Sequence, residues 1–141
     1  MASRACVTGI GGIFFKAQNP DELNSWYYEH LGLAPNDYGS LFEFRSADDP
    51  DELCYLQWSP FPADTEYFDP AKKEFMINYR VKDLEQLLEN LRAAGITVVG
   101  EMETYEYGKF AHIMDPEGNK IELWEPVDKN LTEPSTGDTT H

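Results

Sequence analysis

The stretch Phe75–Leu84 (FMINYRVKDL) decides the fold, because an apolar strand pattern in it leads directly into a helix start at Asp83. An earlier stretch, Ile13–Glu22 (IFFKAQNPDE), has the same order, with Asn19 at the helix start. Asn19 and Asp83 are preferred N-cap residues, and each is followed three residues later by Glu or Gln, as in a capping box. They lie 64 residues apart, which predicts a repeated supersecondary unit.

Leucines and aromatic residues recur at helical spacing after both caps, and the two helices are predicted to end at Gly32 and Gly95. Turn residues separate the remaining apolar runs, and Asp115–Asn119 (DPEGN) is a strong hairpin turn signal. We expect further strands over residues 41–45, 53–58, 97–99, 109–114 and 120–124.

The element order predicts an α+β fold in one domain over residues 8–126. It consists of a module at 8–60, a linker at 61–72 and a module at 73–126. Residues 127–141 are rich in Thr, Ser, Gly and Pro, and we expect a disordered tail there.

The formal net charge of −15 argues against binding to nucleic acid or to an anionic membrane. No apolar run has the length of a secretory or membrane-spanning segment. Cys6 and Cys54 do not form a C-x-x-C pattern, so we expect a reduced, cytoplasmic protein without a disulfide framework.

Three segments in order resemble one family. Trp26–Leu33 (WYYEHLGL) resembles the end of its first helix, Val81–Ile96 resembles its second helix, and Asp115–Leu123 (DPEGNKIEL) resembles its D-P-x-G-x-x-I-E-L signature. This is the vicinal oxygen chelate superfamily, which includes glyoxalase I, bleomycin-resistance proteins, extradiol dioxygenases and methylmalonyl-CoA epimerase. The resemblance implies two tandem βαβββ modules that curl into an open cup, usually completed in a homodimer.

The resemblance also implies where a metal site would lie. Its ligand positions correspond to Gly12, Met76 and Glu122, with a fourth position at Cys54 or Gln57. Glycine has no side-chain donor, and a thioether is a poor ligand for the ions that this superfamily uses. We therefore expect no bound metal and no other cofactor.

Two groups of residues remain as candidates for the cup. Pairing across the turn at Asp115–Asn119 brings His112 near Glu122, as a base and the carboxylate that orients it. Alternatively, His112 faces the helices and Glu122 is held by a tyrosine hydroxyl. The expected ligand-binding residues are Trp58, Gln57, Phe110, Trp124 and Tyr107.

These features predict a protein that binds a small organic molecule, aromatic or cationic, without a catalytic metal. The alternative is a lyase or isomerase of the glyoxalase I or epimerase type with a non-standard site.

Overall fold

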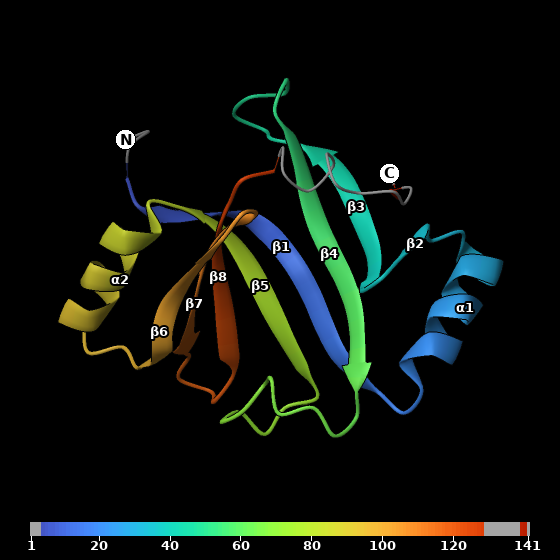
Figure 1. Cartoon of the computed structure of the whole chain (residues 1–141). Coiled ribbons are helices and arrows are strands. Elements are labelled where there is room, and N and C mark those ends of the chain that lie inside the picture. The colour runs from blue at the N-terminus through green and yellow to red at the C-terminus, as the bar shows by residue number, and fades with distance from the viewer. Residues whose placement is uncertain (1–3, 129–138, 141) are drawn as a thin grey trace.

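The structure is a computed structural model that describes residues 4–128 and 139–140. Its strands form one mixed sheet of eight strands in the order β2-β3-β4-β1-β5-β8-β7-β6, flanked by two helices (Figure 1). The elements are β1 (Cys6–Ala17), α1 (Pro20–Leu31), β2 (Pro35–Asn36), β3 (Gly39–Arg45), β4 (Leu53–Pro62), β5 (Phe75–Lys82), α2 (Leu84–Ala93), β6 (Val98–Tyr105), β7 (Gly108–Met114) and β8 (Lys120–Pro126).

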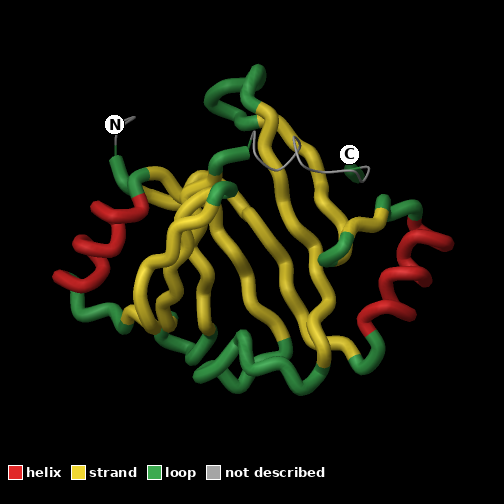
Figure 2. Tube along the Cα trace, viewed as in Figure 1, coloured by secondary structure: helices red, strands yellow, loops and turns green. Residues whose placement is uncertain are grey.

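The topology confirms the predicted repeat. In each module the first strand pairs in parallel with the last, β1 with β4 and β5 with β8. The two modules meet where β1 and β5 pair antiparallel, and the sheet curls into an open cup (Figure 2). The predicted α+β fold of two tandem βαβββ modules is therefore confirmed.

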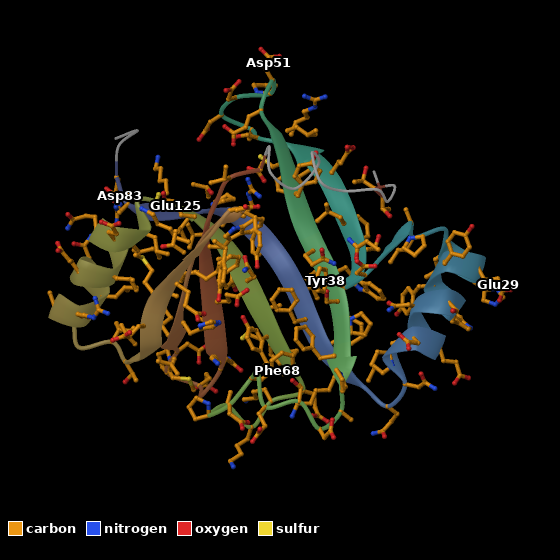
Figure 3. All side chains as sticks on the ribbon, in the orientation of Figure 1. Glu29, Tyr38, Asp51, Phe68, Asp83 and Glu125 are labelled. Carbon is orange, nitrogen blue, oxygen red and sulfur yellow. The ribbon has the colours of Figure 1, made fainter. Side chains whose placement is uncertain are left out.

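Both helices begin at the predicted caps. The Asn19 side chain accepts a hydrogen bond from the Glu22 amide at 3.1 Å, and the Asp83 side chain accepts one from the Gln86 amide. Glu125 of β8 also accepts a hydrogen bond from the Leu84 amide at 2.7 Å, next to Asp83 (Figure 3). The start of α2 is thus attached to the sheet by a side chain.

The larger apolar core lies in the second module. Leu84 and Leu88 of α2 pack against the convex face of the sheet, where Val81, Ala111, Ile113 and Leu123 are buried with them. Successive side chains of a strand point to opposite faces of the sheet, so the residues next to these core positions face the concave side. In the described part of the chain, no helix is long and apolar enough to cross a membrane.

The linker lies two residues later than expected, at 63–74, and packs against the sheet. Strand β4 continues to Pro62, because Phe61 and Pro62 pair with the end of β1. Phe68 is fully buried against Phe14 and Met76. The Lys120 ammonium donates a hydrogen bond to a linker carbonyl, that of Tyr67, at 2.8 Å.

Three described residues of the predicted tail at 127–141 contact the rest of the protein. The Val127 amide donates to the carbonyl of Tyr107, and Asp128 forms an ion pair with Arg80. Thr140 pairs with the edge of β3, donating to the Leu41 carbonyl at 2.8 Å. Backbone groups of an edge strand are open to such pairing. The rest of this prediction, residues 129–138 and 141, lies outside the described residues.

Candidate functional site

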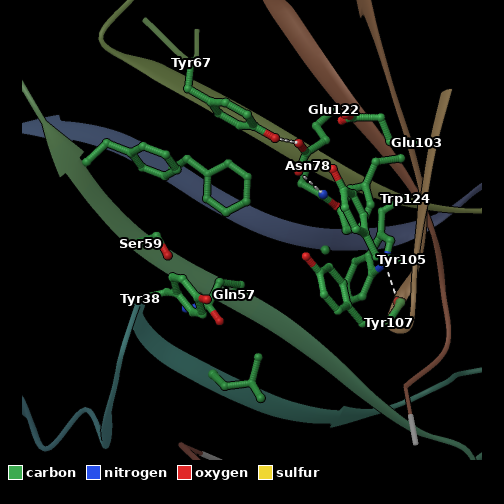
Figure 4. Close-up of a pocket in the computed structure, with 15 residues that line it drawn as sticks. Tyr38, Gln57, Ser59, Tyr67, Asn78, Glu103, Tyr105, Tyr107, Glu122 and Trp124 are labelled. Carbon is green, nitrogen blue, oxygen red and sulfur yellow. Dashed lines mark hydrogen bonds between the residues drawn. The ribbon is translucent and has the colours of Figure 1, made fainter. Parts of the chain in front are cut away.

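The concave face of the sheet holds a cavity of about 460 Å³. Both modules and the linker contribute to its wall (Figure 4). The lining residues are Gly11, Phe14, Tyr38, Leu41, Gln57, Ser59, Phe61, Tyr67, Asn78, Glu103, Tyr105, Tyr107, Phe110, Glu122 and Trp124.

The floor of the cavity is a row across the four central strands. Gly12 of β1 lies opposite Gln57 of β4 and Asn78 of β5, and Asn78 lies opposite Glu122 of β8. A side chain on Gly12 would meet the Phe14 ring at 2.7 Å. The close approach of the Phe14 ring therefore favours glycine at this position. The polar groups of the floor are then the Glu122 carboxylate and the amides of Gln57 and Asn78.

Glu122 is a buried carboxylate with three hydrogen-bond partners. Only 2% of the residue is exposed. Asn78 Nδ2 donates to Oε1 at 2.6 Å, and the Tyr67 hydroxyl donates to Oε2 (Figure 4). His112 Nε2 lies 2.8 Å from Oε2. Burial raises the pKa of Tyr67, and the nearby Glu122 charge and hydrogen bond raise it further. Tyr67 therefore acts only as a donor to this carboxylate.

His112 lies on the concave face, directly opposite Glu122 in the pairing of β7 with β8. Its neighbours Ala111 and Ile113 belong to the core under α2. The alternative in which His112 faces the helices is thus ruled out by the alternation of the strand. The structure brings His112 and Glu122 together, and a tyrosine hydroxyl, that of Tyr67, also holds the Glu122 carboxylate, as one alternative predicted.

Aromatic rings form the wall on the side of β7 and β8. Phe110 and Trp124 stack with centroids 5.8 Å apart and an interplanar angle of 8°. Tyr105 and Tyr107 stack at 5.4 Å and 9°. The Trp124 indole donates to the Tyr107 carbonyl at 2.9 Å, which fixes the orientation of its ring. We call these four residues the aromatic wall.

Arg80 lies behind this wall and connects several strands. Its guanidinium carbon is 5.2 Å from the Trp124 ring and 5.4 Å from the Phe44 ring. It donates to the Tyr55 carbonyl at 2.9 Å and to Asp128 at 2.8 Å. The positive charge of Arg80 is therefore neutralised by a protein carboxylate.

Trp58 is not part of the cavity lining. Its ring packs against Tyr27 of α1 at 4.6 Å and Phe15 at 5.2 Å, on the convex face. Gln57 and Ser59, the residues on either side of it, line the cavity instead. The prediction of Trp58 as a ligand-stacking residue is corrected by the alternation of β4.

The cavity has a negative electrostatic character. Its described lining contains Glu103 and Glu122 but no Lys, Arg or His. Desolvation raises the pKa of both Tyr105 and Tyr107, and the two carboxylates contribute to the increase. The Tyr105 side chain also hydrogen bonds to Glu103.

The ligand positions implied for a metal do not fit one. The register places Asn78 beside Glu122, whereas Met76 lies two residues along, fully buried against Phe14 and Phe68. The floor row provides amides and one carboxylate but neither imidazole nor thiolate, and both oxygens of that carboxylate accept hydrogen bonds. This donor set suits hydrogen bonding to an organic ligand better than tight binding of a transition metal.

Of the two residues considered for the fourth position, Gln57 lies in the floor row and Cys54 does not. Cys54 is buried near Glu52 and Asp128, in a group with ligand atoms within 4.8 Å of one another. Asp128 already forms an ion pair with Arg80, and burial raises the pKa of Cys54 to about 11. This group lies outside the cavity.

Comparison with known proteins agrees with the fold. A family model described as "Glyoxalase-like domain" matches residues 12–124. The structure is similar to methylmalonyl-CoA epimerase from Mycobacterium tuberculosis, with 26% identity, a TM-score of 0.55, and coverage of 89% of this chain and 92% of that one. It is also similar to the Mn(II)-bound glyoxalase from Novosphingobium aromaticivorans, with 17% identity, a TM-score of 0.62, and coverage of 98% of this chain and 42% of that one.

A third similar structure is a glyoxalase/bleomycin resistance protein/dioxygenase superfamily member from Vibrio splendidus 12B01. It has 17% identity, a TM-score of 0.51, and coverage of 86% of this chain and 97% of that one. No match was found among curated proteins.

Proposed function

The chain belongs to the glyoxalase-like domain family, and we propose that it binds a small, planar organic molecule in its cup without a catalytic metal. The observation that carries this proposal is the cavity of about 460 Å³, in which the aromatic wall faces a floor with one buried carboxylate. Concave sites with apolar walls and few polar groups are typical of ligand pockets. Rings fixed by packing provide stacking surfaces with little loss of conformational entropy.

Protein donors already satisfy the carboxylate on the floor. Tyr67, Asn78 and His112 surround Glu122 with hydrogen bonds, so this network holds the charge in place of a metal. This supports binding without a cofactor, and the ligand then contacts mainly the aromatic wall.

Titration with quinoline, a planar neutral probe, tests the proposal. Binding is measured by tryptophan fluorescence and by thermal shift, because ligand at a hundred times its dissociation constant stabilises a protein by about 2.7 kcal/mol. Phe110→Ala and Tyr107→Ala should each weaken binding roughly fivefold, since a stacked aromatic pair contributes about 1 kcal/mol. Tyr28→Ala is the control, because Tyr28 is 58% exposed on α1. If planar probes do not bind, or if all three variants behave alike, the proposal is wrong.

A second candidate function is a lyase or isomerase of the glyoxalase I or epimerase type. The 2.8 Å contact between His112 Nε2 and Glu122 Oε2 favours it, because a carboxylate in this position can orient an imidazole as a base. Solvent deuterium exchange at an acidic C–H of small thioester and hemithioacetal probes tests it. Exchange that is lost in both His112→Ala and Glu122→Gln would favour the enzyme over a simple binding protein.

We also propose that the chain forms a homodimer. Val7, Ile10 and Ile13 lie along the convex face of β1. Val7 and Ile10 lie opposite Val81 and Tyr79 of β5, which belong to the core under α2. The three β1 residues are 49%, 38% and 38% exposed, which is unusual for the middle of a sheet. We call them the β1 strip, and we propose that a second copy of the chain packs against it.

We further propose a cytoplasmic location, consistent with the free thiols of Cys6 and Cys54, and no binding of nucleic acid or membrane.

A further inference from the structure

We propose that Glu103 makes the cup selective for ligands that carry a positive charge. This inference rests on the proposed function, since it concerns the same cavity, and it assigns the selective contact to a residue on β6. The two carboxylates of the cavity differ in their access to a ligand, because Glu122 is buried and Glu103 is exposed.

Glu122 is poorly placed to make the selective contact. It is 2% exposed, and Tyr67, Asn78 and His112 bond to both of its oxygens. Reaching it would require a ligand to displace one of these donors. Glu122 therefore contributes a negative potential at the floor of the cavity. Another group must make the direct contact with the ligand.

Glu103 is exposed and lines the same cavity. Its position opposite Phe110 places it next to a ring that stacks on Trp124. A cation near Glu103 would thus meet a carboxylate and the faces of aromatic rings together.

An irregularity in β6 places Glu103, rather than Glu101, opposite Phe110. Val99 lies opposite His112 and Glu103 lies opposite Phe110, so four steps along β6 correspond to two steps along β7. Gly100, with a φ of 74°, is part of this bulge. Because the bulge adds an even number of residues, the side chains of Val99 and Glu103 both face the cup.

The described part of the protein provides no cation that lines the cavity and neutralises these carboxylates. Arg80 is paired with Asp128, and Lys120 donates to the Tyr67 carbonyl outside the lining. Asn78 adds a further acceptor, because its Nδ2 must face the Glu122 carboxylate and its Oδ1 has no hydrogen-bond partner. Both charged residues in the described lining of the cup are therefore negative, which disfavours carboxylate and phosphate ligands.

Two ring probes of nearly equal size test the inference, namely N-methylquinolinium, a permanent cation, and quinoline, which is neutral at neutral pH. Their dissociation constants are measured at low salt for the wild type, for Glu103→Gln and for Glu101→Gln. Glu101 is the matched control, because it is an exposed glutamate on the same strand that does not line the cavity.

We expect the wild type to bind the cation about tenfold more tightly than quinoline. Glu103→Gln should weaken cation binding roughly fivefold and leave quinoline unchanged, while Glu101→Gln should change neither by more than about 1.5-fold. Equal binding of both probes, or equal losses in the two variants, would overturn the assignment of Glu103 and leave the proposed function intact. If neither probe binds, the proposed function itself fails.

Discussion

The two modules share a topology but differ in how their helices are packed. Helix α2 buries Leu84 and Leu88 against the convex face of its module. Helix α1, which is fully described, has no buried residue, and its Tyr27 ring packs on Trp58 of β4. A repeat in sequence thus specifies strand order and helix position, while the apolar residues of each copy decide how much core forms.

The first prediction compares a leucine from each helix. Leu88→Ala should destabilise the protein by about 3 kcal/mol, because it leaves a cavity in the core under α2. Leu31→Ala in α1 should cost less than about 0.5 kcal/mol, because Leu31 is 60% exposed. Urea unfolding measures both. Similar losses in the two variants would mean that α1 is buried in solution by a contact outside the single chain.

The second prediction concerns the β1 strip, the part of the convex face that no helix covers. Ile10→Asp combined with Ile13→Asp should raise the dimer dissociation constant roughly a hundredfold, because two partly exposed isoleucines of the β1 strip would lose their burial. Sedimentation velocity measures the change. Val127→Asp is the control, since Val127 is 37% exposed and lies outside the strip. A wild-type chain that is monomeric at high concentration would contradict the proposed dimer.

The third prediction compares the two helix caps. Asn19→Ala should cost about 1 kcal/mol through the loss of its bond to the Glu22 amide. Asp83→Ala should cost more, about 2 kcal/mol, because Asp83 has a φ of 55° that alanine tolerates poorly. Asp83→Asn keeps the acceptor and tolerates this backbone conformation, so it should remain within about 0.5 kcal/mol of the wild type. Chemical denaturation measures all three, and a larger loss for Asn19→Ala would reverse the expected order.

The predictable part of the fold is the part fixed by local patterns. The caps at Asn19 and Asp83 and the turn at Asp115–Asn119 are short-range features, and the structure contains all of them. The same turn sets the pairing of β7 and β8, which is why the contact between His112 and Glu122 could be predicted from the sequence.

The features that could not be predicted depend on the register between distant strands. The pairing of β5 with β8 decides that Asn78, rather than Met76, lies beside Glu122. The bulge in β6 decides that Glu103, rather than Glu101, lies opposite Phe110, and the alternation of β4 decides that Trp58 lies outside the cup. A register shift of one residue reverses the face of a side chain, and a shift of two residues changes its partner. No local pattern in these strands reports either kind of shift.

Arg80 links segments that are far apart in the sequence. From β5 it bonds to the Tyr55 carbonyl of β4 and to Asp128 beyond β8, and it stacks on Trp124. A hinge between the modules would have to break this group of contacts while the guanidinium is buried. We therefore expect the cup to be formed before a ligand binds. Ligands should then be selected by shape and charge, and their affinities should differ mainly through their dissociation rates.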